Sequence, residues 1–150
     1  MSGSSKPLPR QTIYSAPFWD AARRGELAMQ SCEACGGLQH PAGPVCRECW
    51  SDRLVWRSVS GRGAIYSYTI VHRTTTGGFS GETPYAVAIV ELDEGPRLTT
   101  NIVDCPLDQV RIDMPVSAVF EPNGEIFLVK FAPARDRENG GSARDGDDRR

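Results

Sequence analysis

Four cysteines between residues 32 and 49 constrain the fold of this chain more than any other feature. They form two pairs, Cys32 with Cys35 and Cys46 with Cys49, with two residues inside each pair and ten between the pairs. A Cys-x2-Cys pair lies on a tight turn that brings two thiolates together, and two such turns complete a tetrahedral four-sulfur site. The spacing therefore predicts a structural metal site, since four thiolates leave no open position for water or substrate.

Zinc is the metal that this ligand set favours, and iron is the alternative that four thiolates also bind. The chain has five cysteines, an odd number, and close pairs of this kind in a reducing compartment favour metal binding over disulfides. His40 lies between the pairs and is expected to be an ordinary loop residue. Cys105 stands alone, with no partner base identifiable in the sequence, and receives no catalytic role.

The residues that follow the two cysteine pairs differ. Gly36 comes after the first pair and can adopt the positive φ that turns backbone N–H groups toward the sulfurs. Trp50 takes the corresponding position after the second pair. Either the same turn forms there, with about 1–2 kcal/mol of backbone strain at Trp50, or the second turn has a different geometry.

From Gly61 onward the sequence becomes a succession of short strands separated by Gly, Pro, Asn or Asp. The five segments are GAIYSYTIVHR, PYAVAIVELD, PRLTTNIVD, PVSAVFE and EIFLVKF. A total of 15 Gly and 11 Pro also favours turns over long helices. We therefore expect a mainly β protein with a small five-stranded barrel. DEGP predicts a tight hairpin, whereas TTTGGFSGET is a long loop that is either disordered or functional.

The expected organisation has four parts. Residues 1–16 form a flexible arm, 17–53 a helix and metal ribbon, 54–133 the barrel, and 134–150 a disordered tail rich in both charges. Pro17 suits the start of a short helix that ends near Gly25, and Leu54 to Ser60 alternates as a half-exposed strand. No segment reaches the roughly 18 apolar residues of a membrane span, and no signal-peptide core is present, so a soluble cytoplasmic protein is expected.

Charge on the predicted barrel weighs against a polynucleotide ligand. Residues 61–132 carry five Lys or Arg against nine Asp or Glu, the wrong sign for a surface that follows phosphates. Arg62, Arg73 and Lys130 are the cations most available to a ligand, a number that suits a discrete phosphate-bearing molecule. Tyr66 and Tyr68 alternate along a strand, and such aromatic residues either stack on bases or pack in the core.

Beyond this order of a ribbon and then a barrel, three segments carry a specific resemblance: PFWDAARRGELAMQSCEACGGLQHPAGPVCREC, SGRGAIYSYTIVHR and PYAVAIVELDEGPRLTTNIVD. Through them the chain resembles the DUF35 family. The resemblance covers about residues 17–133, and it implies an N-terminal helix, a rubredoxin-like zinc ribbon and a C-terminal OB fold. It further implies a non-catalytic accessory subunit that binds a thiolase-like condensing, retro-aldol or acyltransferase enzyme. In such assemblies the barrel helps to hold coenzyme A or acyl-CoA.

The resemblance and the cations together give a set of expected ligand contacts. The loop 74–83 is expected to cover the ligand or contact the partner enzyme. The candidate ligand-binding residues are Arg62, Tyr68, His72, Arg73, Phe79 and Lys130. Two other functions remain open: a zinc-ribbon and OB-fold module that binds nucleic acid, and a self-sufficient hydrolase that uses His72 or Cys105, for which the sequence offers no nucleophile–base pair.

Overall fold

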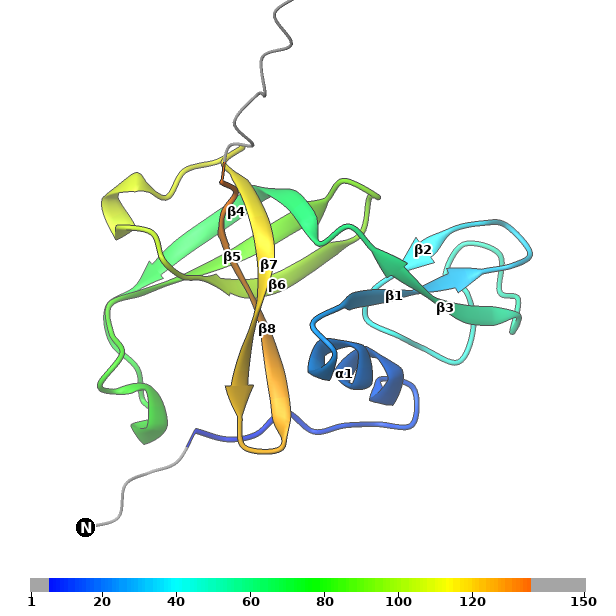
Figure 1. The fold of residues 1–150 in the computed structure, drawn as a ribbon, viewed down its shortest axis with the longest axis horizontal. Coiled ribbons are helices and arrows are strands. Elements are labelled where there is room, and N and C mark those ends of the chain that lie inside the picture. The colour runs from blue at the N-terminus through cyan, green and yellow to red at the C-terminus, as the bar shows by residue number, and fades with distance from the viewer. Residues whose placement is uncertain (1–5, 136–150) are drawn as a thin grey trace, which may run out of the picture.

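Two β units and one short helix make up residues 6–135, the part of the chain that the computed structural model describes (Figure 1). The first unit is a three-stranded sheet of order β2-β1-β3, and the second is a closed barrel of order β4-β5-β6-β8-β7. The α-helix is α1 (Ala16–Arg23), and two single 3-10 turns are η1 (Gly77–Phe79) and η2 (Leu107–Gln109). The strands are β1 (Leu27–Cys32), β2 (Leu38–Gln39), β3 (Leu54–Val59), β4 (Arg62–Val71), β5 (Tyr85–Leu92), β6 (Arg97–Ile102), β7 (Pro115–Asn123) and β8 (Ile126–Pro133). This architecture confirms the expected fold class. No helix within residues 6–135 is long and apolar enough to cross a membrane.

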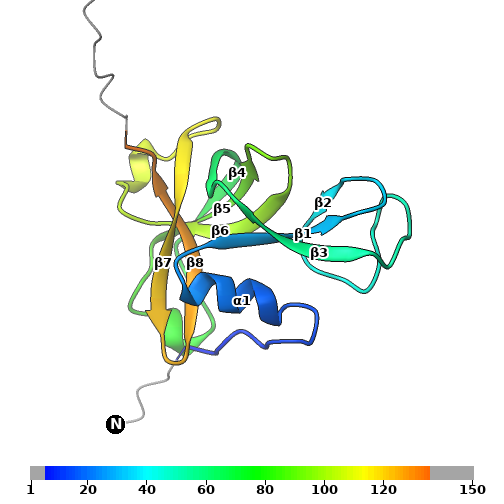
Figure 2. The same cartoon turned by 45° about the vertical axis from the view of Figure 1, so that its right-hand side comes forward.

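Helix α1 begins and ends where the sequence predicts a boundary. Pro17 lies in its first turn, where its missing N–H is not needed. Gly25 follows the helix with φ 75°, and its N–H donates to the carbonyl of Ala22 at 3.0 Å. This left-handed residue satisfies a terminal carbonyl and turns the chain toward β1. The helix buries Phe18, Ala21 and Ala22 and lies between the small sheet and the barrel (Figure 2).

Strand β3 belongs to the small sheet. It pairs antiparallel with β1 along its whole length, from Leu27 opposite Val59 to Cys32 opposite Leu54. The expected division placed this segment with the barrel because its alternation gives no sign of which strand it pairs with. In the structure the chain passes from sheet to barrel at Ser60 and Gly61, where Ser60 donates its N–H and its hydroxyl to the Glu94 carboxylate, both at 2.8 Å.

The barrel has the five strands that the sequence predicts. Four of its strand pairings are antiparallel. The fifth is parallel: it joins β6 to β8 through Ile102 opposite Phe131 and completes the closed barrel. Inward-facing side chains fill the interior, with Ile65, Val90 and Phe131 fully buried. A bulge in β4 between Ile65 and Ser67 interrupts the regular alternation that the sequence suggests there.

The N-terminal arm lies against the barrel over residues 6–15. Lys6 forms an ion pair with Glu82 and lies 5.6 Å from the centre of the Phe79 ring. Leu8 approaches Gly124 in the β7–β8 turn, and the arm runs beneath that turn before entering α1 (Figure 1). Residues 1–5 of the expected arm and 136–150 of the expected tail lie outside the described residues.

Gly63 is required where β4 passes between β5 and β7. It pairs with Leu92 on one side and Val116 on the other, and a Cβ there would overlap the Glu91 carbonyl oxygen and lie 2.9 Å from its carbon. We expect Gly63→Ala to lower the free energy of unfolding by about 3 kcal/mol or more, measured by denaturant titration.

Gly81→Ala is the matched control, because nothing lies within 4 Å of the Cβ it would add. That variant should change stability by less than about 0.5 kcal/mol. Equal stability of the two variants would contradict the close approach at Gly63.

Candidate metal centre and aromatic groove

The four predicted ligands converge at the end of the small sheet. Cys32, Cys35, Cys46 and Cys49 place their sulfur atoms within 4.8 Å of one another. Two of the sulfur–sulfur distances, Cys32 to Cys49 and Cys35 to Cys46, are 3.6 Å. A tetrahedral zinc with bonds of about 2.3 Å needs sulfurs about 3.8 Å apart, whereas a disulfide needs about 2.05 Å. The residues therefore fit a four-thiolate zinc ion.

Backbone N–H groups point at these sulfurs and make one thiol acidic. The Cys35 N–H is the main donor to Cys32, and it lowers the pKa of that thiol to about 6 although burial opposes the shift. Cys35 itself receives the Gly37 N–H, which lowers its pKa, but the adjoining thiols, Cys46 foremost, outweigh this and raise the pKa to about 12. These four sulfurs would hold a zinc ion, whose positive charge would offset the repulsion among the thiolates and keep them deprotonated.

A pair of buried glutamines holds the loop between the two cysteine turns. Gln39 Nε2 donates to Gln30 Oε1 at 2.8 Å, and the same oxygen accepts the Gly43 N–H at 2.9 Å. Gln39 Oε1 accepts the N–H of Arg47, the residue after Cys46, at 3.0 Å. Both amides thus satisfy loop groups that lack strand partners, and they connect the metal ligands to the loop 40–45.

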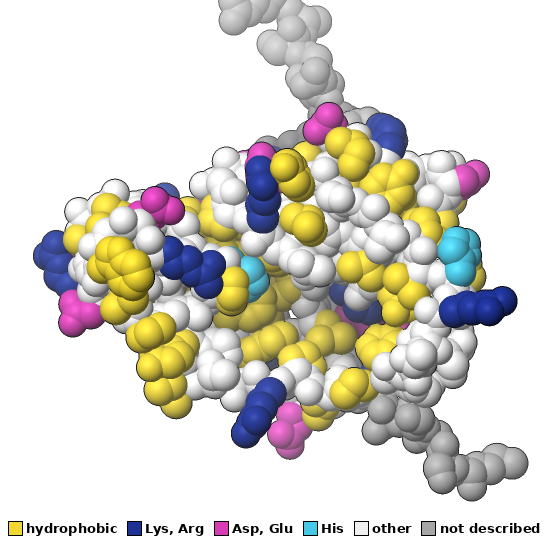
Figure 3. All heavy atoms as spheres, turned by 180° about the vertical axis from the view of Figure 1, so that it is seen from behind, with side chains coloured by type: hydrophobic (Ala, Val, Ile, Leu, Met, Phe, Trp, Pro, Cys, Tyr) yellow, Lys and Arg dark blue, Asp and Glu magenta, His cyan; other side chains and the backbone are white. Residues whose placement is uncertain are grey.

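An apolar groove runs between this loop, α1 and the barrel. It has a volume of about 510 Å³, and Figure 3 shows hydrophobic side chains gathered in a hollow on that face. We call it the aromatic groove; its defining residues are Phe18, Trp19, His40, Trp56, Asn101 and Lys130. The rings of Phe18 and Trp19 meet edge to face at 5.1 Å, and Phe18 and His40 lie 5.4 Å apart.

His40 contributes an uncharged ring to this groove. Burial lowers the pKa of its imidazole, and the positive charge of Arg47 lowers it further. The Arg47 guanidinium also donates to the carbonyls of His40 and Pro41 at 3.2 and 3.1 Å. His40 is thus a fixed part of the groove wall, as well as the loop residue that the sequence predicts.

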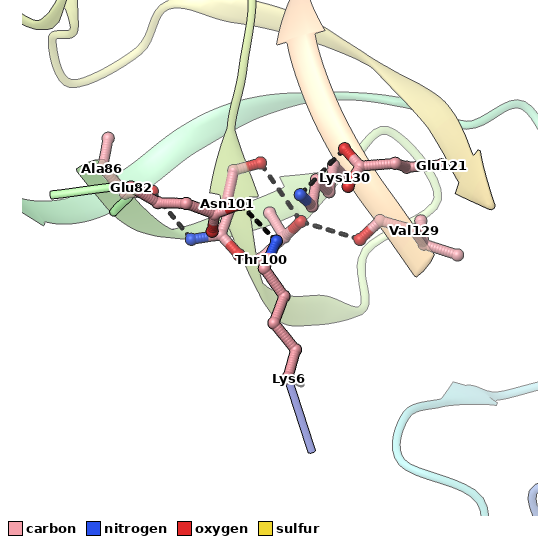
Figure 4. A network of polar contacts seen from close by, with 8 residues as sticks. All are labelled: Lys6, Glu82, Ala86, Thr100, Asn101, Glu121, Val129 and Lys130. Atoms are coloured by element: carbon pink, nitrogen blue, oxygen red, sulfur yellow. Dashed lines mark hydrogen bonds and ion pairs between the residues drawn. The ribbon is translucent and has the colours of Figure 1, made fainter. Parts of the chain in front are cut away.

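A second hollow adjoins the groove at the mouth of the barrel. We call it the barrel-mouth hollow; its volume is about 540 Å³, and its defining residues are Lys6, Phe79, Glu82, Tyr85, Asn101 and Lys130. Lys130 donates to Glu121 at 2.9 Å, and Thr100 donates to the Val129 carbonyl at 3.0 Å (Figure 4). Asn101, Leu128 and Lys130 line both hollows.

The structure brings together only two of the six predicted ligand contacts. Phe79 and Lys130 line the barrel-mouth hollow. Arg62 lines another hollow, with Asp104 and Ser117. The remaining three are exposed on β4 or just after it: Tyr68, His72 and Arg73.

Sequence reasoning missed the aromatic groove because its walls come from five separate parts of the chain. Phe18 and Trp19 read as the apolar side of a short helix, and Trp56 as one position of an alternating strand. The arrangement depends on β3 pairing with β1 and on α1 packing against the barrel, neither of which a local pattern reveals. The one available signal is the adjacent aromatic pair Phe18 and Trp19.

Two family models match the chain in tandem. The rubredoxin-like zinc ribbon domain of ChsH2 matches residues 19–55, and the C-terminal OB-fold domain of ChsH2 matches residues 56–121. A DUF35 domain-containing scaffold protein of Methanothermobacter thermautotrophicus is 40% identical over 113 residues, covering 73% of this chain and 84% of that protein. This chain belongs to the DUF35 family. The family resemblance, the zinc ribbon and the OB fold are thereby confirmed.

Other relatives carry names from acyl-CoA metabolism. A probable enoyl-CoA hydratase alpha subunit of Thermomonospora curvata is 40% identical over 134 residues, which are 89% of this chain but 41% of that protein. The chain thus spans about two fifths of the length of that relative. The benzoylsuccinyl-CoA thiolase subunit BbsA of Geobacter metallireducens is 30% identical over 91 residues, covering 61% of this chain and 59% of that subunit.

A solved structure shares this fold over most of the chain. It is a chain of an Ltp2–ChsH2(DUF35) aldolase, with a TM-score of 0.77 and 38% sequence identity. The match covers 84% of this chain and 98% of that chain. Nearly all of that chain is therefore matched by the ribbon and barrel that are present here.

The zinc site is open to a direct test. We expect the purified chain to contain one zinc ion, measured by elemental analysis. Cys46→Ser should lose it on dialysis against a chelator, because three thiolates and a hydroxyl no longer form the closed site. Cys105→Ser is the control, since Cys105 lies outside the four-sulfur cluster. Retention of zinc by the Cys46 variant would contradict the assignment.

Trp50 provides a second test of the ribbon. Its side chain is 77% exposed while its backbone has φ 64°, so the second turn repeats the geometry of Gly36 with a tryptophan in the left-handed region. Trp50→Gly should be more stable than Trp50→Ala by about 1 kcal/mol, because alanine keeps the steric strain and glycine does not. Thermal unfolding of the zinc-loaded proteins measures the difference, and equal midpoints would show that no strain is stored there.

Proposed function

We propose that this chain is a non-catalytic subunit that docks on a thiolase-like enzyme and helps to bind coenzyme A or an acyl-CoA thioester. The observation that carries the proposal is its similarity to the DUF35 chain of the Ltp2–ChsH2 aldolase, which extends over 98% of that chain. The relation to a thiolase subunit, BbsA, favours the same class of partner. We place the subunit in the cytoplasm, because four zinc thiolates persist in a reducing compartment.

The chemistry of the described residues supports a role without catalysis. The zinc ligands form a closed site. The Cys105 thiol donates to the carbonyl of Pro106 at 3.4 Å, and no imidazole or carboxylate among residues 6–135 hydrogen-bonds to it. His72 is exposed and has no hydrogen-bond partner in the same range. A nucleophile activated by a neighbouring base is therefore not formed within this part of the chain.

The hydratase name of one relative is compatible with this role. That name belongs to a protein of which this chain matches only 41%. Domains beyond the match can carry hydratase chemistry, while the matched part corresponds to the ribbon and barrel. We therefore assign the accessory role, and not hydration, to the fold that this chain shares with that relative.

The proposed ligand contacts lie around the barrel. Phe79 and Lys130 adjoin each other in the barrel-mouth hollow, beside the loop 74–83 that we assign to the ligand or partner. Lys130 is already neutralised by Glu121, which suits polar contact better than phosphate binding. The other four residues, Arg62, Tyr68, His72 and Arg73, stay predictions, because they do not line this hollow.

Purification of the tagged full chain from its native host tests the proposal. We expect a thiolase-like enzyme to co-purify near equal stoichiometry, identified by mass spectrometry. The complex should bind acyl-CoA more tightly than either component, measured by calorimetry, because each component supplies part of the site. The isolated chain should not turn over acyl-CoA thioesters.

Two outcomes would contradict this function. Turnover of an acyl-CoA thioester by the chain alone would make it an enzyme. Recovery of nucleic acid in place of a partner enzyme, with affinity that falls steeply as salt rises, would favour the alternative of a nucleic-acid-binding module.

A further inference from the structure

The aromatic groove has the walls of a site for a flat ring. Trp19 and Trp56 line it from α1 and β3, and the imidazole of His40 adds a third planar surface from the ribbon loop. Aromatic side chains bind other rings through their faces and edges, with little dependence on the identity of the ring. The groove volume of about 510 Å³ lies within the range of small-molecule sites.

The charges in the groove exclude a densely charged ligand portion. Its two cations are Arg10 and Lys130, and Lys130 donates to Glu121 at 2.9 Å with its side chain only 13% exposed. Arg10 lies on the exposed arm and forms no ion pair within residues 6–135. The groove therefore favours an uncharged ring inside, with one cation at the rim for a neighbouring phosphate.

The polar groups of the groove suit a ring with hydrogen-bonding edges better than an aliphatic chain. Asn101 donates its Nδ2 to the carbonyl of Ala86 at 3.2 Å (Figure 4), and its Oδ1 remains an acceptor on a residue that lines the groove. Thr99 adds an exposed hydroxyl on the same strand, and His40 adds a ring that both donates and accepts. A saturated acyl chain would form no hydrogen bond with any of these groups.

We propose that the aromatic groove binds the adenine base of coenzyme A. The inference rests on the proposed function, because adenine is the only aromatic ring in coenzyme A. Its exocyclic amino group can donate a hydrogen bond to Asn101 Oδ1. Its faces can stack on the indole rings of Trp19 and Trp56. Arg10 is the cation beside the adjoining phosphates.

Three residues that line both hollows give this placement a direction. Asn101, Leu128 and Lys130 line the aromatic groove and also the barrel-mouth hollow, which Lys6 of the N-terminal arm lines as well. With adenine at the ribbon end, the pantetheine portion is the part of the ligand that reaches Phe79 and the loop 74–83. The thioester end of the ligand then lies at the mouth of the barrel, away from the residues that hold the base.

The three tryptophans of the chain allow a direct measurement. Trp50 is exposed on the ribbon, away from the groove, so Trp50→Phe leaves an emission that reports Trp19 and Trp56 alone. The zinc-loaded full chain with this substitution is titrated with coenzyme A, adenosine 3′,5′-bisphosphate and pantetheine, with excitation where adenine does not absorb. We expect coenzyme A and the bisphosphate to change the emission, and pantetheine to leave it unchanged.

A pair of variants then tests the groove in the complex with the partner enzyme. Trp56→Leu should weaken binding of adenosine 3′,5′-bisphosphate by about fivefold to a hundredfold, the range expected for loss of one stacking side chain. Trp50→Leu is the matched control and should leave the affinity unchanged. Zinc content and circular dichroism establish that both variants are folded, and Trp56→Phe, which keeps a ring, should recover most of the affinity.

The outcomes separate this inference from the proposed function. If the complex binds acyl-CoA but Trp56→Leu and Trp50→Leu bind the bisphosphate equally, the accessory role stands and the groove assignment is overturned. If an acylated pantetheine changes the emission and the bisphosphate does not, the groove takes the acyl end and the assignment to adenine is wrong. If no complex forms and no coenzyme A binds, both fail.

Discussion

The convergence of four thiols is the constraint on which the ribbon depends, because its sheet is too small to be held by burial alone. Two of its strands have six residues and the third has two. A unit of this size lacks the apolar area to offset the entropy of ordering its loops. Metal binding supplies the missing free energy. Cys32 and Cys46 are buried, so the metal site adds to the interior that Leu27 and Met29 form with the core.

The same site fixes the wall of the aromatic groove. Arg47 follows a metal ligand, its N–H is held by Gln39, and its guanidinium binds the carbonyls of His40 and Pro41. A chain of direct contacts therefore leads from the sulfurs to the groove. Because Trp56 and helix α1 form the other side, the groove exists only where ribbon and barrel are both folded. Its shape thus belongs to the junction of the two units.

Much of this architecture follows from local sequence, and the exceptions have a common cause. The cysteine spacing, the five barrel strands and the DEGP hairpin are each specified by a few adjacent residues, whereas the sequence left two geometries open at Trp50. The pairing of β3 with β1 and the docking of Lys6 on Glu82 join residues far apart in the chain. Such contacts depend on which surfaces the fold leaves open. For the same reason the sequence shows which cations the barrel carries, but it does not show that the fold places them on separate parts of the barrel surface.

The separation of the cations around the barrel limits how this chain alone would hold the phosphates of coenzyme A. Arg97 is paired with Glu91 at 2.7 Å and stacked on Tyr66, and Lys130 is paired with Glu121. Arg62 and Arg73, both exposed, line neither the aromatic groove nor the barrel-mouth hollow as residues 6–135 form them. Under the proposed function, this chain supplies shape and stacking, and the partner must supply much of the positive charge that the phosphates need. Binding of the partner and binding of coenzyme A are then linked, and each raises the affinity of the other by the same factor.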